Sequence, residues 1–130
     1  MPANRLLILL SFALLAACAS QPKQNVTVEN QSECPLQLHE GQNLIVTLPS
    51  NPTTGYRWAI QDSAGGILRK VSPEAYSNPD DTGLVGSGGF STWRFQAFAN
   101  GTGRLLLTYQ QPWAPEEAPV KAFDCSITVN

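Results

Sequence analysis

The sequence is poor in the residues from which metal, nucleic-acid and catalytic sites are usually built. Its 130 residues include one histidine and three scattered cysteines, too few ligands for a four-coordinate zinc site. The 8 lysines and arginines are outnumbered by 10 aspartates and glutamates, and they form no basic stripe of the kind that a nucleic-acid partner requires. We therefore expect no metal, no cofactor and no nucleic-acid partner.

Charged residues are also scarce, at 14% of the chain, whereas 42% of the residues are hydrophobic. A chain with that much apolar content and a net charge of −2 can bury a core, which excludes disorder. The length suits one ordinary domain rather than two. Ten glycines and ten prolines indicate a turn-rich, all-β chain.

The sequence has no apolar run of the roughly 20 residues needed to span a bilayer as a helix. Residues 6–17 are apolar apart from Ser11, and Arg5 precedes them. A charged start, a short apolar core and small residues at the exit predict a secretory signal peptide over residues 1–17. The exit sequence Leu15-Ala16-Ala17-Cys18 resembles the lipobox of bacterial lipoproteins. The alternative is an ordinary signal peptide beside which Cys18 is incidental.

The lipobox resemblance implies that Cys18 carries lipid and anchors the protein stably to a membrane. Residues 18–24 would then be the lipidated cysteine and a short polar tether, and residues 25–130 the folded domain. The chain has Ala19 and Ser20 after the cysteine, with no aspartate in the position that often retains lipoproteins at the inner membrane. We therefore expect a lipid-anchored protein of the bacterial cell envelope, in the outer membrane, facing either the periplasm or the outside.

Two cysteines remain in the predicted mature chain, Cys34 and Cys125. Export would place them in an oxidising compartment, where a disulfide is permitted. In the alternating pattern around it, each cysteine falls on the same side as the apolar residues. Either a buried disulfide or two inert thiols in the core would require this. We favour the bridge, which would close a loop of roughly 90 residues and contribute a few kcal/mol in the chain-entropy model.

Short alternating runs of apolar and polar residues predict the strands. These runs centre on residues 26–28, 36–38, 44–48, 56–60, 93–97, 105–109 and 120–129. No stretch of the mature chain shows a sustained helical period, so about seven strands of this spacing predict a β-sandwich. The segment from Ser72 to Gly89 lacks a strand pattern, and we expect a long functional or mobile loop there.

Residues 48–56 form the first of three connections rich in proline and glycine. Pro52 fixes its own φ and drives Asn51 towards an extended conformation, while Gly55 permits a left-handed turn. Thr53 and Thr54 place hydroxyls at the tip. Such a stiff, uncharged finger has little conformational entropy to lose on binding, which favours affinity. A tight strand connection without a binding role is the alternative.

The second and third connections have different chemistry. Residues 86–90 read Gly86-Ser87-Gly88-Gly89-Phe90, a segment that could lie flat against another protein's backbone. No Lys-Ser or Lys-Thr follows it, so it resembles no phosphate loop. The third connection reads Gln111-Pro112-Trp113 at the end of a strand. Its tryptophan is either an exposed anchor, of the kind enriched at interface hot spots, or a ring folded back over the sandwich.

Taken together, these residues resemble the chagasin family of cysteine-peptidase inhibitors. The resemblance covers about residues 36–129 and is carried by Asn51-Pro52-Thr53-Thr54-Gly55-Tyr56, by the Gly-x-Gly-Gly of residues 86–89, and by Pro112-Trp113. The three motifs occur in the family's order, and the first is the most specific. Gln111 stands where the family usually has arginine, which removes a charge-assisted contact but keeps the aromatic anchor.

The resemblance implies an immunoglobulin-like sandwich that presents three loops at one end to the cleft of a papain-like cysteine peptidase. The peptidase-binding residues would be Asn51, Pro52, Thr53, Thr54, Gly55, Tyr56, Gly86, Ser87, Gly88, Gly89, Phe90, Gln111, Pro112 and Trp113. Thr53 would lie nearest the catalytic Cys–His pair of the peptidase. We therefore expect a monomeric, reversible inhibitor, whose partners are a papain-like peptidase and a membrane.

An enzyme and a non-inhibitory adaptor are the two alternatives to an inhibitor. An enzyme would have to build its site on His39, which lies between two predicted strands, and neither Cys34 nor Cys125 lies in an electropositive stretch that would activate a thiol. A non-inhibitory adaptor or structural lipoprotein of the envelope is the stronger rival, because immunoglobulin-like folds host many functions. The combination of three loops favours the inhibitor.

Overall fold

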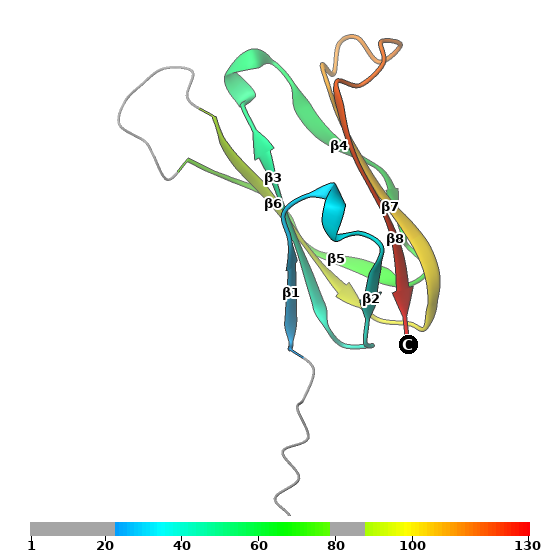
Figure 1. Cartoon of the computed structure of the whole chain (residues 1–130). Coiled ribbons are helices and arrows are strands. Elements are labelled where there is room, and N and C mark those ends of the chain that lie inside the picture. Colours follow the sequence, from blue (N-terminus) through cyan, green and yellow to red (C-terminus); the bar gives the residue numbers. More distant parts are fainter. Residues whose placement is uncertain (1–22, 79–87) are drawn as a thin grey trace, which may run out of the picture.

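The computed structural model describes residues 23–78 and 88–130, which form an immunoglobulin-like β-sandwich (Figure 1). The predicted signal peptide, Cys18 and the residues Gly86 and Ser87 lie outside the described residues. All the described strands fall between Asn25 and Val129. Residues 23–78 and 88–130 therefore contain the two sheets and the core between them. Within the described residues, no helix has the length and apolar character needed to cross a membrane.

Each sheet has four strands. The first sheet has the order β1 (Asn25–Val28), β3 (Asn43–Ser50), β6 (Gly89–Ala97) and β5 (Leu68–Ser77). The second sheet has the order β2 (Leu36–Leu38), β8 (Lys121–Val129), β7 (Gly101–Gln110) and β4 (Arg57–Ser63). The pairs β1–β3 and β2–β8 are parallel, and the other neighbours are antiparallel. The described residues also form two short 3-10 turns, η1 (Gln31–Glu33) and η2 (Pro52–Thr54).

The core follows the alternation that the sequence predicts. On β3 the side chains of Leu44, Val46 and Leu48 are buried, and their neighbours point outward. The same alternation holds along β6 and β8, and the two inner faces meet over a core that includes Phe95 and Phe123. Side chains of successive strand residues point to opposite faces of the sheet. The alternation of apolar and polar residues in the sequence therefore identifies the residues that face the core.

The prediction of a loop from Ser72 to Gly89 is wrong over its first part, because β5 extends to Ser77. With this edge strand the described residues form eight strands, whereas the sequence predicted about seven. The pairing of β5 with β6 is interrupted by register shifts on both sides of Ser72, and Leu68 is its only buried residue. The strand therefore carries no alternation in its sequence. Pro73 is compatible with this position, since an edge strand tolerates a missing N–H.

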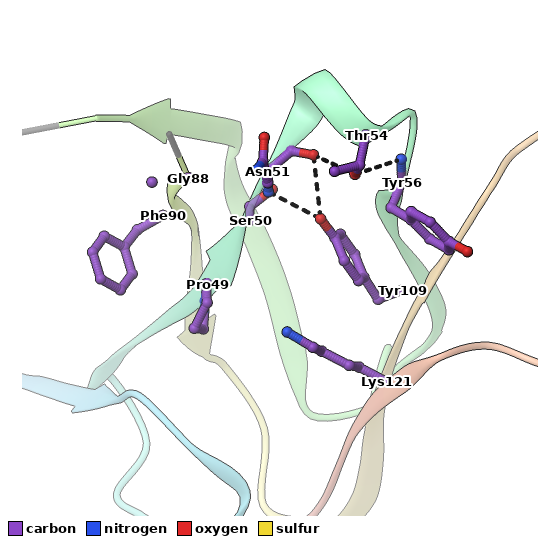
Figure 2. Close-up of a pocket in the computed structure, with 10 residues that line it drawn as sticks. Pro49, Ser50, Asn51, Thr54, Tyr56, Gly88, Phe90, Tyr109 and Lys121 are labelled. Carbon is purple, nitrogen blue, oxygen red and sulfur yellow. Dashed lines mark hydrogen bonds between the residues drawn. The ribbon is translucent and has the colours of Figure 1, made fainter. Parts of the chain in front are cut away.

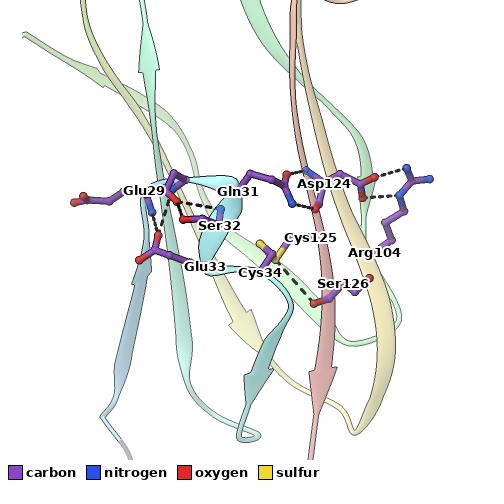
Figure 3. Close-up of a disulfide and its surroundings, with 10 residues drawn as sticks. Glu29, Gln31, Ser32, Glu33, Cys34, Arg104, Asp124, Cys125 and Ser126 are labelled. Atoms are coloured by element: carbon purple, nitrogen blue, oxygen red, sulfur yellow. Dashed lines mark hydrogen bonds and ion pairs between the residues drawn. A yellow bond between two sulfur atoms is a disulfide. The ribbon is translucent and has the colours of Figure 1, made fainter.

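The predicted bridge between Cys34 and Cys125 is confirmed (Figure 3). It joins residues 91 positions apart and ties the segment after η1 to the buried face of β8. Next to the bridge, the side-chain amide of Gln31 donates to the Asp124 carbonyl, and its oxygen accepts from the Asp124 N–H at 2.6 Å. Gln31 thus pairs with the backbone of β8 as a neighbouring strand would.

The strand connections divide between the two ends of the sandwich (Figure 1). The β3–β4 connection, the adjoining ends of β5 and β6, and the β7–β8 connection lie at one end, which we call the loop end. Strand pairing supports this, because Ser50 is opposite Gly89 and Tyr109 is opposite Lys121. The start of β1 and the end of β8 lie at the other end, with the turn that contains His39.

Candidate functional site

The finger, residues 51–56, is held in shape by its own hydrogen bonds. Asn51 is extended and caps η2: its side-chain oxygen accepts from the Thr53 N–H at 3.2 Å and from the Thr53 hydroxyl at 2.5 Å. The Thr54 hydroxyl donates to the Asn51 carbonyl at 2.7 Å. Gly55 ends the turn in the left-handed region, with φ of 81°, which favours glycine. The local sequence therefore dictates the local conformation.

The base of the finger is bound to the second sheet through Tyr109 on β7. The Asn51 N–H donates to the Tyr109 hydroxyl at 2.9 Å (Figure 2). The Tyr109 ring lies 5.5 Å from the ring of Tyr56 and 4.9 Å from that of Trp58, which in turn contacts Trp93 edge-on at 6.3 Å. An aromatic column thus runs from the core to the finger. The alternation of β7 identifies Tyr109 as inward-facing, but the sequence does not reveal its bond to Asn51.

The tryptophan loop, residues 111–120, brings Trp113 against the finger. The ring is 67% exposed, yet a Cβ added to Gly55 would overlap its six-membered ring. Trp113 is therefore exposed, as the anchor interpretation requires, and it also packs on the finger; its role in binding stays a prediction. The turn is closed by hydrogen bonds from the Ala114 N–H to Gln111 and from the Val120 N–H to Tyr109.

The glycine loop is the segment 86–90, and its described part, residues 88–90, lies on the other side of the finger. Gly88 is adjacent to the finger base, because a Cβ added there would come within 3.5 Å of the Ser50 carbonyl. A Cβ on Gly89 would overlap the Ser77 carbonyl, so the approach of β5 and β6 at this point requires glycine. Phe90 follows with its ring 42% exposed. The described residues of all three predicted loops therefore meet around the finger.

A hollow of about 520 Å³, which we call the groove, lies between the finger base and the glycine loop (Figure 2). It is lined by Pro49, Ser50, Asn51, Thr54, Tyr56, Gly88, Gly89, Phe90, Tyr109 and Lys121. Lys121, at the start of β8, is the only charged residue among these, and its ammonium lies 5.6 Å from the centre of the Tyr109 ring. Sequence reasoning did not single out Lys121, because it lies outside all three motifs.

Glu74 on β5 and Arg57 on β4 carry opposite charges that influence each other. Partial burial raises the pKa of the Glu74 carboxyl, while a hydrogen bond with Ser91 and the charge of Arg57 act in the opposite direction. Arg57, at the start of β4 near the finger, therefore has an acidic neighbour within the chain. The cationic charge of the groove comes from Lys121 instead.

The described residues hold no arrangement that resembles a reaction centre. His39 belongs to the turn that bonds to Ala97 and Asn130, at the ends of β6 and β8 away from the loops, and Cys34 and Cys125 are joined in the disulfide. Within residues 23–78 and 88–130, no three histidine, cysteine, aspartate or glutamate side chains gather in a way that could hold a metal ion. The features that the loop end offers are shape, exposed aromatic surface and hydrogen-bonding groups, which are the means of binding a protein surface.

Comparisons of the sequence with known proteins give a consistent result. The model of the chagasin family of peptidase inhibitors, I42, matches residues 37–127. Amoebiasin-1 of Entamoeba histolytica is 32% identical over 102 residues, which cover 78% of this chain and 96% of that protein. Chagasin of Trypanosoma cruzi is 30% identical over 95 residues, covering 69% of this chain and 84% of that protein.

Solved structures show the same fold. The cysteine protease inhibitor EhICP2 of Entamoeba histolytica superimposes with a TM-score of 0.67 at 22% identity, covering 82% of this chain and 96% of that one. Amebosin in solution gives 0.64 at 29% identity, with 85% and 100% covered. PbICP-C, solved in complex with falcipain-2, gives 0.54 at 16% identity, with 83% and 100% covered.

Proposed function

The chain belongs to the chagasin family of peptidase inhibitors, and we propose that it inhibits papain-like cysteine peptidases reversibly by placing its loop end in the active-site cleft. It is therefore an inhibitor rather than an enzyme. The observation that carries the proposal is the meeting of the finger with the described parts of the other two loops at one end of the sandwich. The named relatives and structural neighbours include cysteine protease inhibitors, one of them bound to a peptidase.

The finger is suited to enter a narrow cleft. Thr53 and Thr54 are exposed at its tip, and the hydrogen bonds of Asn51 hold the backbone in a turn. A turn held in this way does not offer the extended backbone that a peptidase cleaves, so the finger would block the catalytic thiolate and stay intact. The rigid conformation also reduces the entropy lost on binding.

The two flanking loops would contact the walls of the cleft. Trp113 lies on one side of the finger, and Gly88, Gly89 and Phe90 lie on the other. Exposed aromatic rings on both sides of a rigid projection are typical of interface hot spots. A complex of this kind usually buries about 1,600 Å² in total.

Titration of papain with the chain from residue 19 onward tests this function. We expect inhibition at stoichiometric or near-stoichiometric amounts, and recovery of the intact inhibitor by mass spectrometry after long incubation. Thr53→Arg should weaken inhibition strongly, because a bulky charge cannot enter the cleft with the finger. Thr102→Arg is the matched control, since Thr102 is exposed on β7 near the opposite end. An absence of inhibition at micromolar protein would refute the function and favour a non-inhibitory adaptor.

We also propose that the protein is anchored through lipid on Cys18 to the outer membrane of a bacterial envelope. The proposal is supported by the Leu-Ala-Ala-Cys exit of residues 15–18 and by the place where the domain begins. Because β1 starts at the end opposite the loops, an anchor there would leave the loop end accessible. Metabolic palmitate labelling that disappears in Cys18→Ala is the expected result. Labelling that persists in the variant, or that is absent from the wild type, would overturn the anchor.

A further inference from the structure

We propose that Lys121 is a specificity-determining residue that receives a carboxylate side chain from the rim of the bound peptidase. The proposal rests on the proposed inhibitory function and deepens it. It assigns the groove beside the finger to an acidic group, so peptidases with a carboxylate at the facing position would be inhibited better than those without one.

The position of Lys121 keeps its charge available. The residue is exposed and lies opposite Tyr109 in the β7–β8 pairing, and its side chain extends beneath the Tyr109 ring towards Pro49 (Figure 2). Contact with the aromatic face holds the ammonium near the groove without neutralising it. Among the described residues, the structure pairs Arg104 with Asp124 but gives Lys121 no carboxylate partner.

The surroundings of the ammonium favour an anion. The other described residues that line the groove are neutral, and Pro49, Phe90 and Tyr109 give it apolar walls. Glu29 lines a neighbouring hollow of about 370 Å³ but forms no ion pair with Lys121. An apolar recess with one uncompensated cation has a positive potential, and that potential strengthens when a partner excludes water.

The same geometry identifies the occupant as the peptidase that the finger engages. Asn51 and Thr54 of the finger form one wall of the groove, and Gly88, Gly89 and Phe90 of the glycine loop form the other. A cleft rim that passes between these two loops must therefore cover the groove. The tryptophan loop supplies no cation of its own, because Gln111 stands where an arginine would provide charge. Lys121, the first residue of β8, thus gives the loop end a cation that the tryptophan loop lacks.

The test compares inhibition constants for papain at low salt and at about 0.5 M NaCl, where charge interactions are strongly screened. We expect Lys121→Met to weaken inhibition about fivefold and Lys121→Glu about fiftyfold at low salt, with both losses smaller at high salt. Lys70→Glu is the matched control, because Lys70 is an exposed lysine on β5 towards the opposite end. Its inhibition constant should stay within about twofold of the wild type. Unchanged inhibition by both Lys121 variants would overturn the proposal.

A second measurement examines the groove without a peptidase. The dipeptides acetyl-Leu-Glu-amide and acetyl-Leu-Gln-amide are titrated into the protein, and the backbone amide shifts of Ser50, Gly88 and Phe90 are followed by NMR. We expect shifts with the glutamate peptide that are absent with the glutamine peptide and lost in Lys121→Met. If the wild type fails to inhibit papain, the proposed inhibitory function is wrong. The peptide titration alone then shows whether the groove binds a carboxylate through Lys121. Equal shifts, or none, with the two peptides would then refute the role of Lys121.

Discussion

The finger and the tryptophan loop achieve order in different ways. The finger is fixed by hydrogen bonds among Asn51, Thr53 and Thr54, and by the bond from Asn51 to Tyr109. The ring of Trp113 is two-thirds exposed and rests against Gly55 of the finger. The first loop is therefore organised by its own sequence, and the second takes its position from the first. Changes in the finger should disturb both loops, whereas changes in the tryptophan loop should disturb only one.

Gly55→Ala should have the largest effect, because it acts on both loops. An added methyl group at φ of 81° costs on the order of 1–2 kcal/mol and overlaps the Trp113 ring. We expect inhibition of papain to weaken by about a hundredfold or more. Gly41→Ala is the control, since Gly41 has φ of 94° but open space around it and lies in the turn at the opposite end. A similar loss of inhibition in both variants would show that strain alone, and not the contact, is responsible.

Trp113→Ala should come next, and should leave the finger intact. Truncation of a hot-spot tryptophan typically costs about 2 kcal/mol or more, which corresponds to roughly a thirtyfold loss of affinity. The melting temperature should change little, because the ring is mostly exposed. Phe98→Ala provides the control, as an aromatic residue that is 39% exposed outside the loop end. A large drop in melting temperature without a loss of inhibition would contradict the anchor role.

Asn51→Ala should loosen the finger, because it removes the side chain that caps η2. Loss of a capping side chain costs about 1 kcal/mol, so we expect roughly a fivefold weaker inhibition constant and slow cleavage of the finger by papain. Asn30→Ala is a comparison variant, because Asn30 caps η1 in the same way but lies outside the finger. The two variants should lose similar stability, measured by urea unfolding, and only Asn51→Ala should lose inhibition. Equal inhibition by both would mean that finger rigidity does not matter.

Tyr109→Phe should have the smallest effect, since it removes only the hydroxyl that accepts from the Asn51 N–H. A hydrogen bond of this kind contributes about 1 kcal/mol or less, and we expect about a threefold loss of inhibition. The direct readout is hydrogen exchange at the Asn51 amide, which should become faster while the amides of the β3 core stay protected. Unchanged exchange at Asn51 would mean that the finger does not depend on the second sheet.

The sequence predicted features whose causes are local. The strands on both sides of the core follow from alternation, and the finger turn follows from a capping asparagine, a proline and a glycine within five residues. The sequence favoured the disulfide because both cysteines fall on the apolar side of their alternating strand patterns. The edge strand β5 was missed because its exposed, irregularly paired residues leave no alternation.

The sequence did not predict the contacts that join distant segments. The bond from Asn51 to Tyr109 spans 58 residues, and the contact of Trp113 with Gly55 depends on how two loops fold towards each other. Lys121 enters the groove because β8 pairs with β7 at Tyr109, a register that no motif specifies. These parts of the site come from tertiary packing, so they required the structure.

The place of β8 in its sheet has a consequence for synthesis. The last of the described strands is an interior strand that pairs with β2 on one side and β7 on the other. Until residues 121–129 are available, β2 has no partner in the sheet, and Cys34 has no Cys125 to join. A chain with so many long-range pairings folds slowly, and its sandwich cannot be completed before residues 121–129 have been made. Removal of residues 125–129 should therefore abolish the whole domain, including the loop end at the other end of the sandwich.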